Sequence, residues 1–334
     1  MKAIVLVSGG LDSILAARLI KEQGIQIVPL NFKIPFSHRD KKLTPEEQDK
    51  PDKVTHNLGA ELKIIDIGND FLKLFEDPEH GFGANMNPCI DCKILMLRKA
   101  KELMPQLGAA FIVTGEVLGQ RPMSQHKQAL EMIAKESGLE GLVLRPLSAK
   151  FLPETIPEKE GWIERNKLLN FSGRSRKPQL ALAEKLGIKT YLQPAGGCLL
   201  TDPKFANRLK DLLSHQGLNP ENVELLKLGR HFRISHKTKL VVGRDEKENE
   251  ALESLAQEND YLFTPNEELA GPTSLGRGVF SEELLRLCCS ITYRYCDLNG
   301  KGEAEIIYKR IPDKQGRVFK ISAIEEAKLQ SLRI

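Results

Sequence analysis

Short apolar runs alternate with segments of helical periodicity through the first third of the chain. The apolar runs are rich in β-branched residues, which is typical of buried strands, and they span residues 3–7, 25–32, 61–67 and 110–114. Helices are predicted between them over residues 14–23, 54–58 and 94–103. Strands that alternate with helices predict an α/β fold with a Rossmann-like, doubly wound parallel sheet.

The pattern changes after Thr201-Asp202-Pro203, where we expect a boundary. Beyond it, helices are predicted over residues 205–215 and 249–258, and strands over residues 239–244 and 303–308. This mixture without regular alternation is typical of an α+β module. We therefore expect a first domain over residues 1–205 and a second, smaller α+β domain over residues 220–334.

Length and composition fit two packed domains. The chain has 334 residues, 41% hydrophobic and 28% charged, which excludes a disordered chain or a coiled-coil rod. The net charge of +4 is too small to indicate a nucleic-acid partner by itself. No apolar run reaches the ~18 residues that cross a bilayer. We therefore expect a cytoplasmic protein without a membrane partner, whose six cysteines are reduced.

A glycine-rich turn joins the first predicted strand to the first helix. Residues 8–13 read Ser-Gly-Gly-Leu-Asp-Ser, which differs from both the Walker loop and the dinucleotide-binding fingerprint. The glycines allow a tight turn, and the amides at the helix start, with the Ser8 and Ser13 hydroxyls, predict a cradle for an anion. Asp12 is placed to help hold Mg²⁺ against phosphates.

Three cysteines stand in loop-like surroundings. Cys89 and Cys92 form a C-x-x-C pair at the start of a helix, which is expected to lower the pKa of Cys92, and Cys198 follows two glycines. Three thiolates would bind a [4Fe–4S] cluster and leave one iron open for hydrosulfide. Two alternatives remain: a persulfide on Cys198 that Cys92 resolves as a disulfide, or a redox or zinc pair with an unrelated third cysteine. Apolar neighbours place Cys288, Cys289 and Cys296 in the core.

Polar and basic positions follow the strands of the first domain. Gln120, Gln125 and Arg145 come after the fourth strand, at the edge where ligands of open α/β sheets bind. Residues 173–179 form a basic loop before a predicted helix over residues 180–186. Its cations would clamp tRNA or ATP phosphates, or they belong to a solvated loop. They are Arg174, Arg176 and Lys177.

The second domain contains a concentrated basic run. Residues 227–244 hold six lysines and arginines, two histidines and no acidic residue. Such a run favours phosphate binding even when the overall charge is modest. The alternative is a charged strand edge that resists aggregation.

The glycine-rich turn resembles the PP-loop of the ATP pyrophosphatases, which cleave ATP between the α and β phosphates. Residues 114–116, 118–120 and 145–147 look like the tRNA 4-thiouridine synthetases within that group, and residues 87–92 and 197–198 look like the paired cysteine sites of the tRNA 2-thiouridylases. The resemblance covers residues 1–205 and implies a fold of the PP-loop/HUP type. It departs from the second family at Cys89, where many members have Asp, so the modified position stays open.

The resemblance implies roles for named residues. ATP would be bound by Ser8, Gly9, Gly10, Asp12, Ser13, Phe32, Thr114, Gly115 and Gln120, with plain core packing as the alternative for Phe32. The catalytic residues would be Asp12, Cys92 and Cys198, and the metal ligands Cys89, Cys92 and Cys198.

A weaker resemblance covers residues 220–334. Residues 229–232, 243–245 and 270–272 are similar to the RNA-binding module of the NFACT proteins. This implies tRNA binding through Arg230, His231, Arg233 and Arg244.

Together these features predict ATP-dependent thiolation of a tRNA uridine. The implied cofactors are ATP, Mg²⁺ and a [4Fe–4S] cluster, and the implied partners are tRNA and a sulfur donor, either sulfide or a cysteine desulfurase. Two other hypotheses remain open: a non-catalytic tRNA- or ribosome-binding factor gated by ATP, and a PP-loop ligase that acts on a small metabolite.

Overall fold

The computed structural model describes residues 1–37, 58–189, 191, 198–297 and 302–334. Within these residues the chain divides into two compact units, Met1–Thr201 and Asp202–Ile334. Among the described helices, none has the length and apolar composition needed to cross a bilayer.

A five-stranded parallel sheet forms the centre of the first unit. Its strand order is β3-β2-β1-β4-β5, and every pairing is parallel, which confirms the predicted fold class. The strands are β1 (Lys2–Leu6), β2 (Gln26–Lys33), β3 (Lys63–Asp66), β4 (Phe111–Thr114) and β5 (Val143–Leu144). The order reverses between β1 and β4, so the binding crevice of this fold opens where these two strands end.

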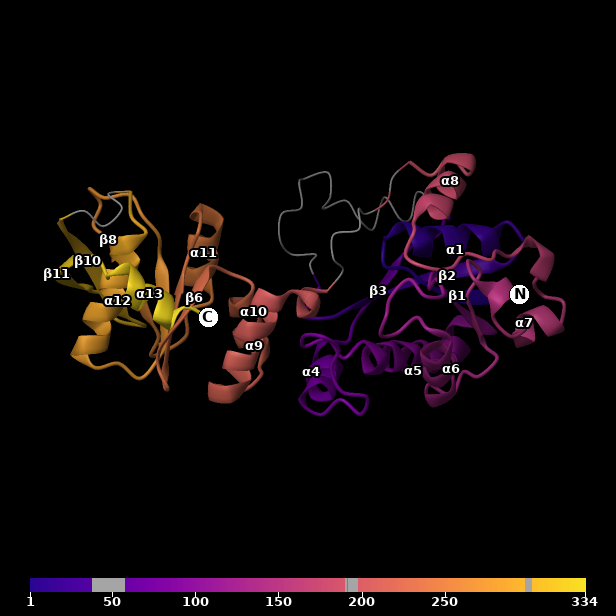
Figure 1. Cartoon of the computed structure of the whole chain (residues 1–334), viewed down its shortest axis with the longest axis horizontal. Helices are drawn as coiled ribbons and strands as arrows, with labels where there is room; N and C mark the ends of the chain where they lie inside the picture. Colours follow the sequence, from indigo (N-terminus) through magenta and orange to yellow (C-terminus); the bar gives the residue numbers. More distant parts are fainter. Residues whose placement is uncertain (38–57, 190, 192–197, 298–301) are drawn as a thin grey trace. The chain divides into compact units, whose positions relative to one another are not determined.

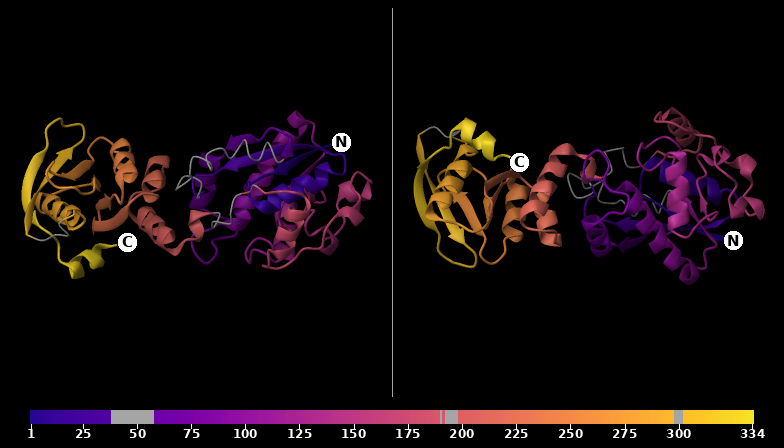
Figure 2. Two further views of the ribbon diagram at one scale, coloured as in Figure 1. Left: turned by 90° about the horizontal axis from the view of Figure 1, so that it is seen from above. Right: turned by 60° about the horizontal axis from the view of Figure 1, so that its bottom comes forward.

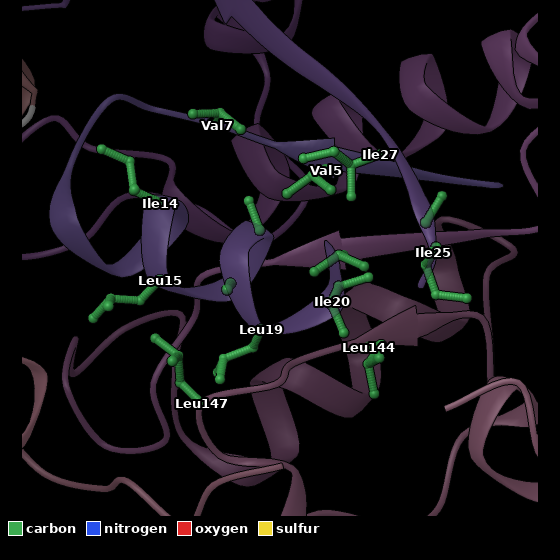
Figure 3. Packing of buried hydrophobic residues seen from close by; sticks show 14 of the residues in the cluster. Val5, Val7, Ile14, Leu15, Leu19, Ile20, Ile25, Ile27, Leu144 and Leu147 are labelled. Carbon is green, nitrogen blue, oxygen red and sulfur yellow. The ribbon is translucent and has the colours of Figure 1, made fainter. Parts of the chain in front are cut away.

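Helices cover both faces of this sheet (Figure 1). They are α1 (Leu11–Lys21), α4 (Gly68–Glu76), α5 (Cys89–Leu107), α6 (Lys127–Glu136), α7 (Ile156–Lys159) and α8 (Lys177–Lys185). Because successive strand residues point to opposite faces, Val5 of β1 packs with Leu15 and Leu19 of α1 (Figure 3). Ile4 packs on the other side with Ile94 of α5. Both faces are therefore buried, as a parallel sheet requires.

The second unit is built on a six-stranded antiparallel sheet with the order β11-β10-β8-β9-β7-β6. The strands are β6 (Arg230–Ser235), β7 (Thr238–Val242), β8 (Tyr261–Pro265), β9 (Ser274–Gly278), β10 (Glu303–Arg310) and β11 (Arg317–Ser322). The helices are α9 (Pro203–His215), α10 (Pro220–Leu226), α11 (Glu246–Ser254), α12 (Glu282–Arg294) and α13 (Glu326–Leu332). Helix α12 packs on β8, β10 and β11 (Figure 2). The predicted α+β class is confirmed.

Several boundaries differ from the predictions. Helix α5 begins at Cys89, five residues before the predicted start. The polar residues of its first turn interrupt the helical spacing of apolar residues, so the sequence pattern did not include this turn. Helix α11 begins at Glu246, since Asp245 accepts a hydrogen bond from the Glu248 amide as its N-cap. The predicted helix over residues 54–58 falls almost wholly outside the described residues. All three cysteines predicted for the core, Cys288, Cys289 and Cys296, are at most 1% exposed.

Candidate active site

The glycine-rich turn is held by its own serines. Ser13 Oγ donates to the Gly10 carbonyl at 2.8 Å, and the Ser8 amide donates to Ser13 Oγ at 3.3 Å. Gly9 has a φ of +78°, in the left-handed region that favours glycine. Gly10 then caps α1 without a side chain, so no capping group competes for the exposed amides of the first helical turn.

Gly115 brings the segment after β4 against this turn. A Cβ atom at Gly115 would lie 2.5 Å from the Ser13 amide nitrogen, closer than real side chains come to backbone. The absence of a side chain is therefore what lets residues 114–116 approach the start of α1. The structure thus brings Thr114 and Gly115 beside the turn, at the strand ends where this fold binds ligands.

Asp12 has one partnered and one unpartnered oxygen. Gln120 Nε2 donates to Asp12 Oδ2 at 2.9 Å, and Gln179 Nε2 approaches Gln120 Oε1 at 3.5 Å. Asp12 Oδ1 is buried and has no hydrogen-bond partner among the described residues. A buried carboxylate oxygen without a partner is costly. The donor set therefore fits a cation such as Mg²⁺, which prefers carboxylate oxygen.

The predicted basic loop lies beside the same segment. Ser172 forms a bridge with Leu118, and the Gly173 amide donates to the Leu118 carbonyl at 2.7 Å. Three cations follow directly, and none forms an ion pair within the described chain: Arg174, Arg176 and Lys177. Because Gln179 contacts Gln120, this loop stands two side chains away from Asp12.

Three other predicted contacts lie in the interior. Phe32 is 7% exposed and packs in the core, which supports the core alternative for this residue. Arg145 is equally buried and donates to Glu116 and to the Leu130 carbonyl, so it braces the segment after β4. Gln125 is 6% exposed, and its Oε1 has no hydrogen-bond partner among the described residues.

Glu116 is a buried carboxylate that the sequence did not single out as a site residue. It is 3% exposed, accepts hydrogen bonds of 3.0 Å from Thr114 Oγ1 and Arg145 Nε, and lies 3.3 Å from Lys93 Nζ. Burial by itself would raise the pKa of Glu116. The charges of Lys93 and Arg145, with the two hydrogen bonds, outweigh that effect and lower the pKa to about 2.

The three predicted cysteines share one neighbourhood. Cys89 and Cys92 lie in the first turn of α5, and Cys198 forms an isolated bridge with Ser37. Burial raises the pKa of Cys92 to about 12, and the Cys198 and Cys89 thiols add to the increase. Burial also raises the pKa of Cys198 to about 11, again with a contribution from Cys89. The predicted lowering of the Cys92 pKa is therefore wrong, because desolvation outweighs the helix N-terminus.

Two asparagines connect the cysteine segments. Asn87 Nδ2 donates to Cys89 Sγ at 3.2 Å, and Asn85 Nδ2 donates to the Thr201 carbonyl at 2.9 Å. Thr201 Oγ1 in turn donates to the Cys198 carbonyl at 2.7 Å. The segment before α5 is thus tied to the segment that carries Cys198.

The cysteine sulfurs do not form a compact single-ion site. Among the described residues, the three metal-binding side chains whose donor atoms lie within 4.8 Å of one another are Glu79, His80 and Glu136. A cluster places its thiolates on separate irons and needs wider spacing than one ion does.

In the group of Glu79, His80 and Glu136, His80 Nδ1 faces Asp91 at 3.0 Å and Nε2 faces Glu136 at 3.2 Å. The hydrogen bond to Asp91 raises the pKa of His80, which favours a cation rather than a ligand.

Several cations of the basic run, residues 227–244 of the second unit, are paired with acidic residues that the fold brings next to them. Asp211 on α9 accepts hydrogen bonds of 2.8 and 2.6 Å from Arg233 and one of 3.1 Å from Lys239. His231 is 1% exposed, and its Nε2 contacts the Leu228 carbonyl at 2.7 Å. Contrary to expectation, neither Arg233 nor His231 presents a free cation to RNA, because Asp211 pairs with Arg233 and the Leu228 carbonyl contacts the buried His231.

Two family models match separate parts of the chain. Residues 1–150 match the model described as Thiamine biosynthesis protein (ThiI), and residues 229–333 match the NFACT protein RNA binding domain. The tRNA-specific 2-thiouridylase MnmA of Marinobacter nauticus is 27% identical over 246 residues, which are 71% of this chain and 60% of that protein. A probable tRNA sulfurtransferase of Thermococcus kodakarensis is 29% identical over 148 residues, 44% of this chain and 36% of the relative.

Among solved structures, the U34-tRNA thiolase NcsA from Methanococcus maripaludis with its [4Fe-4S] cluster is 19% identical, with a TM-score of 0.35 over 68% of this chain and 70% of that chain. The chain spans 60% and 36% of the lengths of the two curated relatives named above. The chain is therefore similar to the ThiI family over residues 1–150 and to the NFACT RNA binding domain over residues 229–333.

Proposed function

We propose that this protein is an ATP-dependent tRNA uridine sulfurtransferase. It adenylates a uracil carbonyl oxygen and then replaces that oxygen with sulfur from the cysteine site. The similarity to the two families and the activities for which the relatives are named support this substrate class.

One observation carries the proposal: a short chain of contacts joins the glycine-rich turn to the cysteines. Gly115 packs on Ser13, the next residue Glu116 pairs with Lys93, and Lys93 follows Cys92 on α5. An activated base bound at the turn would therefore lie close to the thiols. Neither a small-metabolite ligase nor an ATP-gated binding factor needs that arrangement.

The turn performs the activation. A uracil carbonyl carbon resists substitution because its oxygen is a poor leaving group, and adenylation converts that oxygen into part of AMP. The amides at the start of α1 and the Ser8 hydroxyl would stabilise charge that develops on pyrophosphate, while the Ser13 hydroxyl, which donates to the Gly10 carbonyl, holds the turn. Asp12 Oδ1 would hold Mg²⁺, which supplies further charge neutralisation. Arg174, Arg176 and Lys177, which form no ion pair within the described residues, would bind phosphates of ATP or tRNA.

The cysteines supply the sulfur. Cys89, Cys92 and Cys198 would hold a [4Fe–4S] cluster, which offers one iron without a protein ligand as the place where sulfide is held. The donor is sulfide itself or a cysteine desulfurase. The target base must leave its stack before it is attacked, as for other enzymes that modify bases.

The proposal is tested by measuring release of AMP and pyrophosphate from ATP with and without tRNA. We expect release that depends on tRNA in the wild type and is lost in Asp12→Asn, with tRNA affinity unchanged. Asp66→Asn is the matched control, because Asp66 ends strand β3, two strands from β1, where it accepts from the Gly68 amide and forms an exposed ion pair with Lys33 at 3.6 Å. Release without tRNA would favour a metabolite ligase, and no release would favour a binding factor.

A further inference from the structure

Four arginines from separate segments of the second unit meet beside strand β6. Arg230 begins β6, pairs with Val242 and donates to the Gly243 carbonyl at 3.0 Å, which places it next to Arg244. Arg333 forms a bridge with Phe232, two residues along β6. Arg208 on α9 donates to the Leu226 carbonyl at 3.2 Å, four residues before Arg230 in the chain.

These guanidinium groups are close enough to act on one another. Burial lowers the pKa of Arg208, and the Arg244 and Arg333 charges lower it further. Burial also lowers the pKa of Arg230, with the same two charges contributing. Like charges gathered in a partly desolvated place are unfavourable unless an anion compensates them.

The carboxylates near these four arginines do not balance their positive charge. Glu248 accepts hydrogen bonds of 2.9 and 2.7 Å from Arg244, and it also accepts from the Gly229 amide. Asp202, the other carboxylate acting on Arg208, caps α9 by accepting from the Phe205 amide at 2.8 Å. Glu326, the carboxylate that interacts with Arg333, already pairs with Arg294 at 3.3 Å. Four cations therefore face three acids that already have partners.

At least one of the four arginines has an N–H donor without a partner in the described residues. Arg208 Nε is buried and has no hydrogen-bond partner among the described residues. Arg230 lies with its guanidinium carbon 4.6 Å from the centre of the Tyr295 ring, which holds the side chain in place. Arg244 and Arg333 are exposed, so the cluster is open to solvent on that side.

We propose that Arg208, Arg230, Arg244 and Arg333 form a binding site for a backbone phosphate of RNA. The inference rests on the proposed function only in taking RNA as the partner. The site is open to solvent at Arg244 and Arg333. It therefore suits a phosphate of an RNA chain that crosses it better than a small free anion, which would need an enclosed pocket. Arg208 lies before residue 229, so the site extends beyond the part of the chain that matches the RNA binding domain.

The test is tRNA binding by the full chain, without ATP, over a range of salt concentrations. We expect Arg208→Gln and Arg333→Gln each to raise the Kd about ten-fold and to reduce the salt slope by about one. The control is Arg286→Gln. Arg286 also pairs with an acid, Glu282, and lies 4.1 Å from an aromatic ring, that of Phe319. Phe319 belongs to β11, the edge of the sheet opposite β6. We expect the Kd of this control to be unchanged.

The outcomes separate this inference from the proposed function. Equal Kd values for wild type, Arg208→Gln and Arg333→Gln, or equal weakening by Arg286→Gln, would overturn the phosphate site, even if sulfur transfer is intact. Because Arg333 is exposed, its variant remains informative if Arg208→Gln unfolds. Inorganic phosphate at about 10 mM should not displace the tRNA; displacement abolished by Arg208→Gln would instead show a site for free phosphate. Binding that behaves as expected without thiolation would refute the proposed function alone.

Discussion

Gln120 and Asp12, which are 108 residues apart in the chain, are joined by a 2.9 Å hydrogen bond. The bond fixes one oxygen of the Asp12 carboxylate and leaves the other buried and unpartnered within the described chain. Because Gln120 also meets Gln179, it links the glycine-rich turn to the basic loop before α8. The first unit thus presents an oriented carboxylate at the glycine-rich turn, linked to a loop whose three cations form no ion pair within the described residues.

Gly115→Ala tests the close approach of the segment after β4. A methyl group there would lie 2.5 Å from the Ser13 amide nitrogen, so backbone must move. We expect loss of ATP binding by isothermal calorimetry and a decrease of about 1–3 kcal/mol in the free energy of unfolding. Gly161→Ala is the control: its positive φ of +68° strains an alanine there, but no atom lies within 4 Å of the added Cβ, so it destabilises the fold without a clash at the turn. Unchanged ATP affinity in Gly115→Ala would contradict this account of the turn.

Glu116→Gln tests the buried carboxylate between the turn and the cysteine helix. Removing the charge leaves Lys93 and Arg145 without their partner, and we expect a loss of about 3–5 kcal/mol at pH 7. The folded pKa of about 2 lies below the unfolded value near 4.3. The stabilisation is therefore complete above the unfolded pKa and is lost as the pH falls towards 2. Denaturant unfolding of both proteins from pH 7 to 2.5 should show the difference shrinking; a constant difference would refute the pairing.

His80→Gln should show the opposite dependence on pH. The hydrogen bond to Asp91 and the carboxylate of Glu136 raise the pKa of His80, so its contribution is complete below the unfolded pKa of about 6.5. It is lost as the pH rises through the folded pKa. We expect the destabilisation of His80→Gln, measured by chemical unfolding, to be larger at pH 6 than at pH 9. Equal destabilisation at both values would mean that His80 acts by packing alone.

Substitution of the three clustered cysteines should remove iron. In anaerobically reconstituted protein, we expect Cys89→Ala, Cys92→Ala and Cys198→Ala each to lose bound iron and sulfide by elemental analysis. Cys296→Ala is the control, because Cys296 is 1% exposed in the core of the other unit. Full thiolation by iron-free wild-type protein would support the persulfide alternative. Iron retained by all three variants would exclude a cluster on these residues.

The sheet and the turn were predictable because their determinants are local. A run such as residues 3–7 followed by Ser-Gly-Gly needs no distant partner to be recognised. The pairing of Glu116 with Lys93 was not predictable, because the two residues lie on different elements and neither stands in an unusual local pattern. The prediction that Arg233 in the basic run is free to bind RNA was wrong for the same reason. Asp211, which pairs with Arg233, lies 22 residues earlier in the chain and outside the run. Burial likewise reversed the expected pKa of Cys92.

The proposed function requires that one ATP is converted to AMP for each uridine thiolated. Reconstituted protein, tRNA, sulfide and radiolabelled ATP, incubated without oxygen, allow AMP and thionucleoside to be counted in the same sample by chromatography and mass spectrometry. We expect equal amounts of AMP and thionucleoside from the wild type, and neither product from Asp12→Asn. AMP formed in the presence of tRNA without any thionucleoside would contradict the proposed function.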